Sequence, residues 1–250
     1  MLKRERQKAI LELLDKERQV SSSELIKKFK CSEDTIRRDL RELDQQGLLK
    51  RIYNGAIRIG PPITTFEQRL SVNVDAKKKI AQKTLQFLKE DSLILIDGGT
   101  TNYYLAQEIP DNFSATVITN SPYITIQLLK KKYLNIITLG GIFAKRAAIS
   151  LGVETVDALS TFRIDTYIMG IHNFHPEVGV TMHSQQEALI KSKMVKSAEE
   201  VIAPATSDKL GVYSSFICCK ATQVDQLVTD SKDIKLLKKF KKKNVSIEYV

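Results

Sequence analysis

The sequence predicts an α/β protein with two domains. Short amphipathic helices and a hairpin signal fill residues 1–59, and from residue 75 onward apolar strands alternate with helices. Strands and helices in alternation form a mostly parallel sheet with helices on both faces. The chain has 250 residues, which is enough for a small helical domain followed by a larger α/β domain.

Composition narrows the class of protein. The sequence is 42% hydrophobic, and it has no run of about 18 apolar residues that would predict a transmembrane helix. Its start, Met-Leu-Lys-Arg-Glu-Arg, is charged and no apolar signal segment follows, so we expect a cytoplasmic protein with no membrane partner. Cys31, Cys218 and Cys219 show neither Cys-x-x-Cys spacing nor a histidine cluster, which predicts reduced packing residues, no metal and no cofactor.

The positive charge is concentrated near the N-terminus. The whole chain carries +10, and residues 1–58 hold 15 Lys and Arg against 10 Asp and Glu, a net of +5. A basic segment of this kind favours a polyanionic partner. A second group of lysines near the C-terminus is interpreted as a solvated helix face: Lys238, Lys239, Lys241, Lys242 and Lys243.

Two short helices are predicted first. Residues 3–17 place Ile10, Leu13 and Leu14 on one face, as in an amphipathic helix. The serines at 21–23 are a helix-start signal, and a second short helix buries Leu25, Ile26 and Phe29.

The third helix, from Glu33 to about Gln46, has two distinct faces. Ser32 is its N-cap, and three apolar residues at helical spacing share one face: Ile36, Leu40 and Leu43. Charged residues occupy the opposite face: Asp34, Arg37, Arg38 and Arg41. A short helix, a tight turn and a helix with an arginine-rich outer face form the helix-turn-helix plan, whose second helix enters the major groove of DNA. The alternative is a solvated helix with ion pairs such as Asp34–Arg38 or Arg38–Glu42.

A hairpin follows the third helix. Residues 48–59 alternate around Tyr53-Asn54-Gly55, and Asn-Gly between short β-prone runs is a strong turn signal. Its basic flanks, Lys50, Arg51 and Arg58, are typical of the wing of a winged helix, which contacts DNA phosphates or the minor groove. The candidate DNA contacts are therefore Ser32, Asp34, Thr35, Arg37, Arg38, Arg41, Lys50, Arg51, Tyr53 and Asn54.

Gly60-Pro61-Pro62 ends the hairpin and predicts a domain boundary. We expect a winged helix-turn-helix domain at 1–59, a linker at 60–74 and an α/β domain at 75–250. In the second domain helices are expected at 75–89, 122–132, 153–160, 185–198 and 232–243, and strands at 93–96, 115–119, 135–139, 165–170, 201–202, 226–229 and 245–249.

The stretch from Leu93 to Thr101 carries the strongest ligand signal of the second domain. Four apolar residues form a buried strand, two glycines allow a sharp turn, and a helix then begins near Thr101. The free N–H groups and positive dipole of a helix start suit a phosphate, although many α/β proteins use such a turn only for packing. Later strands also end in glycine or a polar residue, at Asn120, Gly140-Gly141 and Met169-Gly170. Since ligands bind at the carboxyl ends of parallel strands, we interpret these ends as one polar pocket, with ordinary turn residues as the alternative.

The chain resembles the DeoR family of bacterial transcription regulators. In the N-terminal half the resemblance lies in Ser-Glu-Asp-Thr-Ile-Arg-Arg-Asp-Leu-Arg-Glu-Leu at 32–43, Gly-Leu-Leu-Lys-Arg at 47–51 and Asn-Gly-Ala at 54–56. The family commonly has His-Gly-Gly-Ala in the wing, where this chain has Tyr53-Asn54-Gly55-Ala56. The rest of the chain resembles the family's sensor domain, which is similar in fold to ribose-5-phosphate isomerase and the coenzyme A transferases. The resemblance covers roughly residues 3–230 and implies a phosphorylated sugar or related metabolite as effector.

The resemblance also implies which residues bind that effector. They are Asp97, Gly98, Gly99, Thr100, Thr101, Asn120, Gly140, Gly141, Glu187, Lys191 and Lys209, and the strand-end pattern adds Gly170 and the nearby His172. Lys191 and Lys209 would neutralise a phosphate or carboxylate, and Asp97 and Glu187 would accept sugar hydroxyls. Glu187 and Lys191 are four residues apart, so the alternative for them is a surface ion pair on one helix.

Two segments depart from the family pattern. Thr206 stands where the family usually has aspartate, and His172-Asn173 follow Gly170 where aspartate or serine is usual. We expect His172, His175 and His183 on a loop without metal-ligand spacing, with His172 as an effector contact.

The leading hypothesis is a sequence-specific, non-enzymatic DNA-binding repressor of sugar metabolism, working as a homodimer or homotetramer that reads repeated half-sites. One alternative is a sugar-phosphate isomerase fused to a DNA-binding domain, with Glu187 and Lys191 as its acid–base groups. Another is a DNA-binding protein whose α/β domain serves only for oligomerisation.

Overall fold

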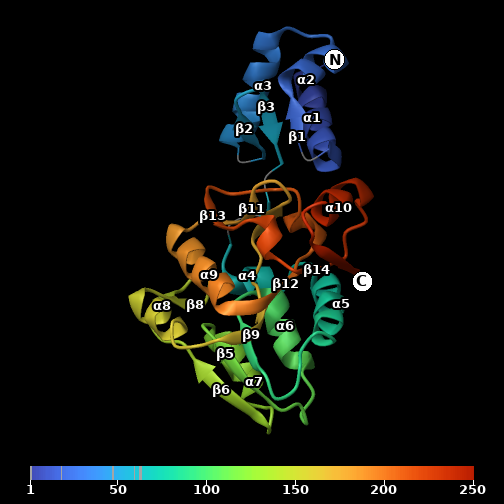
Figure 1. Cartoon of the computed structure of the whole chain (residues 1–250). Helices are drawn as coiled ribbons and strands as arrows, with labels where there is room; N and C mark the ends of the chain where they lie inside the picture. The colour runs from blue at the N-terminus through green and yellow to red at the C-terminus, as the bar shows by residue number, and fades with distance from the viewer. Residues whose placement is uncertain (1, 18, 47, 59, 62–63) are drawn as a thin grey trace. The chain divides into compact units, whose positions relative to one another are not determined.

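The computed structural model describes residues 2–17, 19–46, 48–58, 60–61 and 64–250 of the chain (Figure 1). The expected motif residue Gly47, the hairpin end at Ile59 and the connection at Pro62 lie outside these residues. Two units divide the chain, residues 1–62 and residues 63–250, and each has its own apolar core.

The N-terminal unit is a winged helix. Its helices are α1 (Lys3–Glu17), α2 (Ser22–Phe29) and α3 (Glu33–Gln45), and its strands are β1 (Gln19–Ser21), β2 (Lys50–Ile52) and β3 (Gly55–Ile57). The three predicted helices and the hairpin around Tyr53-Asn54 are confirmed. Strand β1 is an addition, since it pairs antiparallel with β3 and gives the sheet order β1-β3-β2.

Local signals set where α2 and α3 begin. Ser21 and Glu24 form a reciprocal capping box at α2, and the Ser32 side chain accepts a hydrogen bond from the Thr35 N–H at α3. The apolar face of each helix then packs into a core made of Ile10, Leu14, Val20, Leu25, Ile36, Leu40, Leu43, Leu49 and Ala56.

A buried polar contact ties α1 to α3. Asp39 is 1% exposed, and its carboxylate pairs with the Arg6 guanidinium and accepts a hydrogen bond from Gln7. Beside it, the Glu42 carboxylate accepts hydrogen bonds from the Lys3 ammonium at 2.7 Å and from the Gln7 side-chain amide at 2.8 Å. These contacts hold α1 across α3 and so fix the orientation of the third helix.

The second unit contains a seven-stranded sheet in which every ladder is parallel. Its order is β15-β14-β12-β9-β4-β5-β6. The strands are β4 (Leu93–Ile96), β5 (Ala115–Thr119), β6 (Leu134–Thr138), β9 (Ile164–Ile168), β12 (Ala198–Pro204), β14 (Gln226–Thr229) and β15 (Ser246–Tyr249). The predicted parallel α/β architecture is confirmed.

The strand order reverses between β4 and β9. From β4 the chain builds outward through β5 and β6, and it then returns to the other side of β4 and builds outward through β9, β12, β14 and β15. The loops after β4 and β9 therefore leave in opposite directions, and a crevice opens at the carboxyl ends of these two strands.

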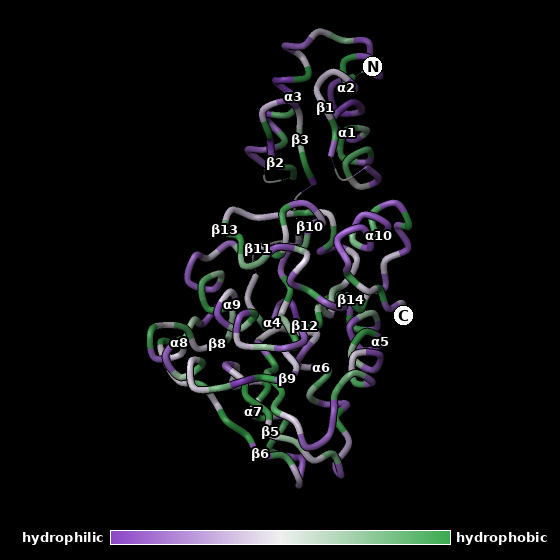
Figure 2. The backbone as a smooth tube through the Cα atoms, in the orientation of Figure 1, coloured by the Kyte–Doolittle hydropathy of each residue, from purple (hydrophilic) through white to green (hydrophobic). Residues whose placement is uncertain are grey.

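Alternate residues of each strand pack on opposite faces of this sheet. Ile94, Ile96 and Val117 pack with α5 (Val74–Leu85), α6 (Thr100–Glu108) and α7 (Pro122–Leu128). Leu95 and Ile118 pack on the other face, together with α8 (Val153–Leu159), α9 (Gln185–Ser197) and α10 (Ile234–Lys241). In Figure 2 the tube through β5 is mostly green, whereas exposed α10 has long purple stretches from its lysines.

Several short strands were not predicted. Strands β10 (Asn173–His175), β11 (Gly179–Met182) and β13 (Phe216–Cys219) form a separate antiparallel sheet, and β7 (Ile142–Ala144) pairs with β8 (Ile149–Leu151). The expectation of one histidine-bearing loop at 172–183 is therefore wrong, because His175 lies in β10 and a β-hairpin occupies this segment. Three-residue strands such as β7, β8 and β10 are too short to show an alternating pattern in the sequence.

The expected linker at 60–74 also differs from the structure. Helix α4 (Phe66–Leu70) occupies its second half, and Thr65 and Gln68 form a capping box at its start. Phe66 is fully buried and stacks on Tyr123 with ring centroids 4.4 Å apart. Because an apolar anchor is buried here, residues 66–74 are part of the second unit. No helix within the described parts of the chain is long and apolar enough to cross a membrane.

The contact between α1 and α3 makes a testable prediction. Asp39→Ala would remove the buried carboxylate that pairs with the Arg6 guanidinium. The free energy of unfolding is therefore expected to fall by about 3 kcal/mol. The measurement is urea unfolding followed by circular dichroism. Glu33→Ala is the control, because Glu33 forms an exposed pair with Arg37 that contributes less than about 1 kcal/mol. Equal losses in the two variants would contradict the role given to Asp39.

Candidate functional site

The charged face of α3 is open to solvent. Asp34, Arg37, Arg38 and Arg41 are exposed, while Ile36 and Leu40 of the same helix are buried. Arg37 makes an exposed ion pair at 2.7 Å with Glu33, four residues earlier on the same helix. The alternative interpretation expected ion pairs within this helix, and this pair joins different residues from the two given as examples. A pair of this exposure leaves the guanidinium free to exchange its carboxylate for a phosphate or a base edge.

Ser32 and Thr35 have a structural role at the start of α3. The Ser32 Oγ accepts from the Thr35 N–H and lies 2.8 Å from the Thr35 hydroxyl. Their hydroxyls are thus engaged with each other in the helix cap.

The wing supplies further exposed groups. Lys50, Arg51, Tyr53 and Asn54 are all exposed, and Tyr53 at the hairpin tip has no packing partner covering it, with 101% exposure. The Asn54 carbonyl accepts from the Ser22 N–H at 2.8 Å, which attaches the turn to the start of α2. Since β2 packs beside α3, one unit carries both the arginines of the helix and the basic residues of the wing.

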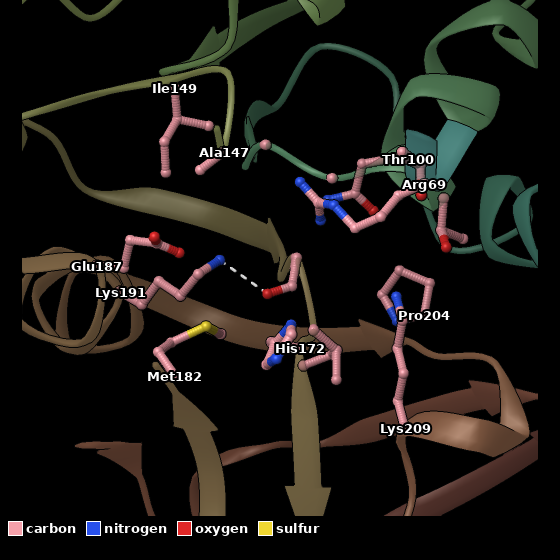
Figure 3. Close-up of a pocket in the computed structure, with 16 residues that line it drawn as sticks. Arg69, Thr100, Ala147, Ile149, His172, Met182, Glu187, Lys191, Pro204 and Lys209 are labelled. Carbon is pink, nitrogen blue, oxygen red and sulfur yellow. Dashed lines mark hydrogen bonds between the residues drawn. The ribbon is translucent and has the colours of Figure 1, made fainter. Parts of the chain in front are cut away.

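An open cavity lies at the crevice between β4 and β9 (Figure 3). Loops after several strands contribute to it, as predicted from the glycines and polar residues at the strand ends. Its lining residues are Arg69, Gly98, Gly99, Thr100, Thr101, Asn102, Ala147, Ile149, Gly170, Ile171, His172, Met182, Glu187, Lys191, Pro204 and Lys209.

A buried ion pair between Asp97 and Lys191 forms the wall behind this cavity. Asp97 is fully buried, and the Lys191 ammonium donates to its carboxylate and to the Gly170 carbonyl, the latter at 2.7 Å (dashed in Figure 3). The carboxylate also accepts from the Tyr167 hydroxyl at 3.1 Å and from the Gly98 N–H at 2.7 Å. Asp97 is fully buried and does not line the cavity, so its carboxylate faces Lys191 and not the space in which a ligand was expected.

Glu187 and Lys191 do not form the surface pair that their spacing allowed. Lys191 is only 4% exposed and is paired with Asp97 instead. Glu187 lies one turn earlier on α9 with its carboxylate toward the cavity (Figure 3). Burial raises the pKa of Glu187, although nearby Lys191 opposes the shift.

The loops after β4 and β9 approach closely. A Cβ atom at Gly170 would collide with the carbonyl oxygen of Gly98, so only glycine allows the two loops to meet there. Asn102 strengthens this junction, because its side-chain amide donates to the carbonyls of Asp97 and Ile168 at 2.7 and 3.1 Å. The two loops thereby hold the floor of the cavity in one geometry.

The start of α6 is suited to an anion. Gly99 is its N-cap residue and provides no side chain to satisfy the first N–H groups of the helix. Thr101 Oγ1 and Asn102 Oδ1 are buried without a hydrogen-bond partner in the described chain, and both residues line the cavity. Unfilled donors at a helix start, next to a threonine hydroxyl, match the oxygens of a phosphate.

Burial changes the protonation of two further lining residues. It lowers the pKa of Lys209 to about 8, although Asp208 opposes the shift, so the ammonium is still charged near neutral pH. Burial, followed by the neighbouring His183, lowers the pKa of His172 to about 3, so His172 is neutral there. The rings of His172 and His183 lie 4.4 Å apart at an angle of 71°, and no cluster of three or more metal-binding side chains occurs among the described residues.

Two cationic residues were missed from the sequence. Arg69 of α4 lines the cavity, and together with Arg146 it also lines an adjoining hollow. The hollow shares Arg69, Ala147, His172 and Glu187 with the main cavity, so the two spaces lie side by side. The sequence offered no signal for Arg69 because it lies in the stretch expected to be a linker.

Four expected site residues do not line the cavity: Asp97, described above, and Asn120, Gly140 and Gly141. Asn120 is buried behind it, where its side chain accepts from the Gly98 N–H at 3.1 Å and supports the loop. Gly140 and Gly141 are exposed, and the Gly140 carbonyl accepts from the Thr155 hydroxyl at 2.6 Å. They shape a turn between β6 and β7. Thr206, at the departure from the family pattern, is buried and starts the 3₁₀ turn Ser207–Lys209 that presents Lys209.

The comparison with known proteins decides the family. Residues 72–231 match the family described as the DeoR C terminal sensor domain, and residues 6–61 match the DeoR-like helix-turn-helix domain. The chain belongs to the DeoR family. The resemblance seen in the sequence is thereby confirmed, and this DeoR-family protein is a transcriptional regulator with a DNA-binding and a sensor domain.

Individual relatives cover nearly its whole length. It is 31% identical over 233 residues to YulB of Bacillus subtilis strain 168, an uncharacterized HTH-type transcriptional regulator, and this spans 92% of the chain and 90% of YulB. It is 28% identical over 232 residues to the glycerol-3-phosphate regulon repressor of Escherichia coli K12, spanning 92% of each. Among solved structures, ribose 5-phosphate isomerase A from Neisseria gonorrhoeae overlaps 60% of this chain and 56% of its own, with 14% identity and a TM-score of 0.41.

The buried pair behind the cavity gives a second prediction. Asp97→Asn would leave the Lys191 ammonium buried without a counter-charge and lower the free energy of unfolding by about 3–5 kcal/mol. Urea unfolding monitored by circular dichroism measures the loss. Asp111→Asn is the matched control, because Asp111 is 82% exposed in its pair with Lys131. The loss of unfolding free energy in this control is expected to be below about 1 kcal/mol. A loss no larger at Asp97 than at Asp111 would contradict the dependence of the fold on this pair.

Proposed function

We propose that this DeoR-family regulator is a repressor of a sugar-metabolism operon, and that a sugar monophosphate in the cavity controls its DNA binding. The observation that supports the effector most is the uncapped start of α6 beside Lys209, because it offers N–H donors and a cation at one point. The relative from Escherichia coli is named a glycerol-3-phosphate regulon repressor, which points to the same class of effector.

The charge of the cavity fits a dianion. Arg69, Arg146, Lys191 and Lys209 bring four positive charges to the two adjoining spaces, and their carboxylates are Glu187 together with Asp97 behind Lys191, which leaves +2. A phosphate monoester carries close to two negative charges at pH 7, because its second pKa is about 6. One phosphate group therefore balances the cavity.

The remaining polar groups suit a sugar. Glu187 accepts hydrogen bonds when it is ionised, and neutral His172 has one ring nitrogen, Nε2, that is buried without a partner. Thr101 and Asn102 each hold an unpartnered oxygen toward the same space. A ligand with several hydroxyl groups would satisfy these atoms, whereas an apolar ligand would leave them unpaired.

In the DNA complex, α3 enters the major groove and the wing lies along the adjacent backbone. Arg37, Arg38 and Arg41 supply forked donors for guanine edges or phosphates, and Lys50 and Arg51 supply phosphate contacts. A single winged helix reads few base pairs, so we propose a homodimer or homotetramer that reads repeated half-sites.

We propose no catalytic step for the sensor unit. An aldose–ketose isomerase needs a positioned general base and a group that stabilises the developing oxyanion. Lys191 is committed to Asp97, and the candidate bases left among the described lining residues are the Glu187 carboxylate and the neutral His172 imidazole, whose pKa of about 3 makes it a weak base. Incubation with pentose and hexose phosphates is expected to give no isomerisation above the background rate, and turnover of any of them would support the enzyme alternative.

A third prediction addresses the recognition helix. Arg37→Ala and Arg38→Ala are each expected to weaken binding to the DNA upstream of the chain's own gene by about 1–3 kcal/mol, because each removes a guanidinium contact. Fluorescence anisotropy at fixed salt measures the affinity. Arg163→Ala is the matched control, since Arg163 is an exposed arginine of the sensor unit before β9. Unchanged affinity in both α3 variants would overturn the assignment of this helix.

A fourth prediction addresses the effector and its pH dependence. Lys209→Met removes the ammonium while retaining much of the side-chain volume, and it is expected to weaken sugar-phosphate binding by about tenfold or more. Thr101→Val is isosteric and loses only the hydroxyl, so about fivefold is expected. In the wild type, the pKa of Lys209 near 8 means that the ammonium loses its proton as the pH rises through 8, so affinity falls above pH 8 and this fall is absent in Lys209→Met.

Isothermal titration calorimetry with glycerol 3-phosphate, fructose 1-phosphate, glucose 6-phosphate and inorganic phosphate measures these affinities. A gel-shift titration with the same compounds then shows whether the bound ligand releases the DNA. If no compound binds to the wild type, the proposed effector class is wrong. If one binds equally well to Lys209→Met, the phosphate is not held at the start of α6.

A further inference from the structure

Helix α4 connects the cavity to the segment that joins the two units. It begins at Phe66, and Arg69 on its last turn reaches into the cavity with its guanidinium (Figure 3). Thr64, two residues before the helix, lines the adjoining hollow. A five-residue helix thus carries a cavity residue and directly continues the connecting segment.

Among the described residues, helices on one face of the sheet supply the hydrogen bonds and ring contacts that hold α4. The Lys77 ammonium of α5 donates to the Arg69 carbonyl, and the Tyr104 hydroxyl of α6 donates to the Leu70 carbonyl at 3.1 Å. The Arg69 carbonyl also accepts from the Val72 N–H at 3.2 Å, so the two side-chain bonds attach the end of α4 to α5 and α6 in addition to its backbone bonds. Tyr104 lies on the same helix whose start forms the anion site, so α4 and that site are attached to one rigid element.

The other end of α4 is held by aromatic packing and one strong hydrogen bond. Phe66 stacks on Tyr123 and meets Tyr103 edge-on at 6.0 Å. The Tyr123 hydroxyl donates to the Glu67 carboxylate at 2.6 Å, and this bond is the leading cause that lowers the pKa of Glu67. A displacement of α4 would have to break this contact as well as the bonds at its other end.

The Arg69 guanidinium is poised for an anionic partner. Its Nε donates to the Thr65 carbonyl at 3.4 Å, and no ion pair of Arg69 occurs within the described residues. Burial lowers the pKa of Arg69, because its charge is removed from water without a close carboxylate, and Glu187 opposes the shift only from a distance. A planar guanidinium in this state gains strongly from paired hydrogen bonds to phosphate or carboxylate oxygens.

We propose that Arg69 binds the effector directly and that α4 transmits the occupancy of the cavity to the segment leading to the DNA-binding unit. The inference rests on the proposed function, and it adds the residue and the helix through which regulation passes. In the structure, the Arg69 side chain is hydrogen-bonded to the Thr65 carbonyl at the start of its own helix. With an anion bound, the guanidinium is drawn to the ligand and Thr65 loses that contact.

This exchange supplies the differential contact that regulation requires. A ligand shifts a conformational equilibrium only by as much as its free energy of interaction differs between the two states. Arg69 makes one contact in each state, and the contact it gives up lies at Thr65, next to the connecting segment. The change is therefore local, and it occurs at the end of α4 where the chain leaves the sensor unit.

The first part of the test concerns Arg69 as an effector contact. Calorimetry with the four phosphate compounds named above is expected to show about tenfold or greater loss of affinity in Arg69→Gln. The loss in Arg69→Lys is expected to be smaller, because lysine retains the charge but not the paired N–H donors of the guanidinium. Arg163→Gln is the matched control and should bind as the wild type does. Hydrogen exchange over residues 64–72 should change on ligand addition in the wild type and not in Arg69→Gln.

The second part concerns α4 as the transmitting element. Tyr123→Phe keeps the ring stacked on Phe66 but removes the bond to Glu67, and Tyr133→Phe, at an exposed tyrosine, is its control. Tyr123→Phe is expected to bind the ligand within about twofold of the wild type. The ratio of DNA dissociation constants with and without saturating ligand should fall by about threefold or more.

The outcomes separate this inference from the function on which it rests. If the wild type binds none of the compounds, the proposed function and this inference both fail. If the wild type binds and Arg69→Gln binds equally well, only the assignment of Arg69 is overturned. If Arg69→Gln loses binding but Tyr123→Phe, and also Phe66→Leu, retain the full ratio, Arg69 is an effector contact and the transmission through α4 is overturned.

Discussion

The buried pair of Asp97 and Lys191 is the interaction on which the sensor unit depends. It joins the end of β4 to helix α9 across 94 residues of sequence, at the point where the strand order reverses. A lone charge in this position would be costly, but here the carboxylate also accepts from Tyr167 and Gly98, so neither ion is left unsatisfied. The Gly170 carbonyl shares the same ammonium and brings the end of β9 into the junction.

This junction leaves the front of the cavity free for a ligand. Asp97 and Asn120 are used entirely in holding the loops, and the unpartnered atoms belong to the residues in front of them, Thr101, Asn102 and His172. The loops behind the cavity are therefore held by internal contacts, whereas the polar atoms that a ligand would meet have no hydrogen-bond partner among the described residues. Such a division is the physical basis of a pre-organised site, because the cost of ordering the loops is met in folding and not in binding.

The DNA-binding unit is organised in the same way. A buried carboxylate, Asp39, ties α3 to α1 through Arg6 and Gln7, whereas the arginines at 37, 38 and 41 on the outer face remain exposed. Helix α3 is thus fixed by one face and free to contact a partner with the other. Both units separate the charges that hold the structure from the charges that are available to a ligand.

The sequence by itself determined the architecture and the family. Periodicities of 3.6 and 2 residues in long elements are local properties, so the three N-terminal helices, the Asn54-Gly55 hairpin and the alternating parallel strands could all be predicted. The glycines and polar residues after β4 and β9 also predicted where the cavity would open, because carboxyl ends of parallel strands meet at one edge.

Only the tertiary structure decided the role of each site residue. Asp97 is buried behind the cavity because its carboxylate pairs with Lys191, which is distant in sequence. Arg69 could not be predicted, since its place in the cavity depends on Phe66 docking against Tyr123 and not on any local pattern. Contacts between residues far apart in the chain leave no periodic signal, and for that reason the sequence predicts the elements, while the folded chain determines which side chains face the ligand.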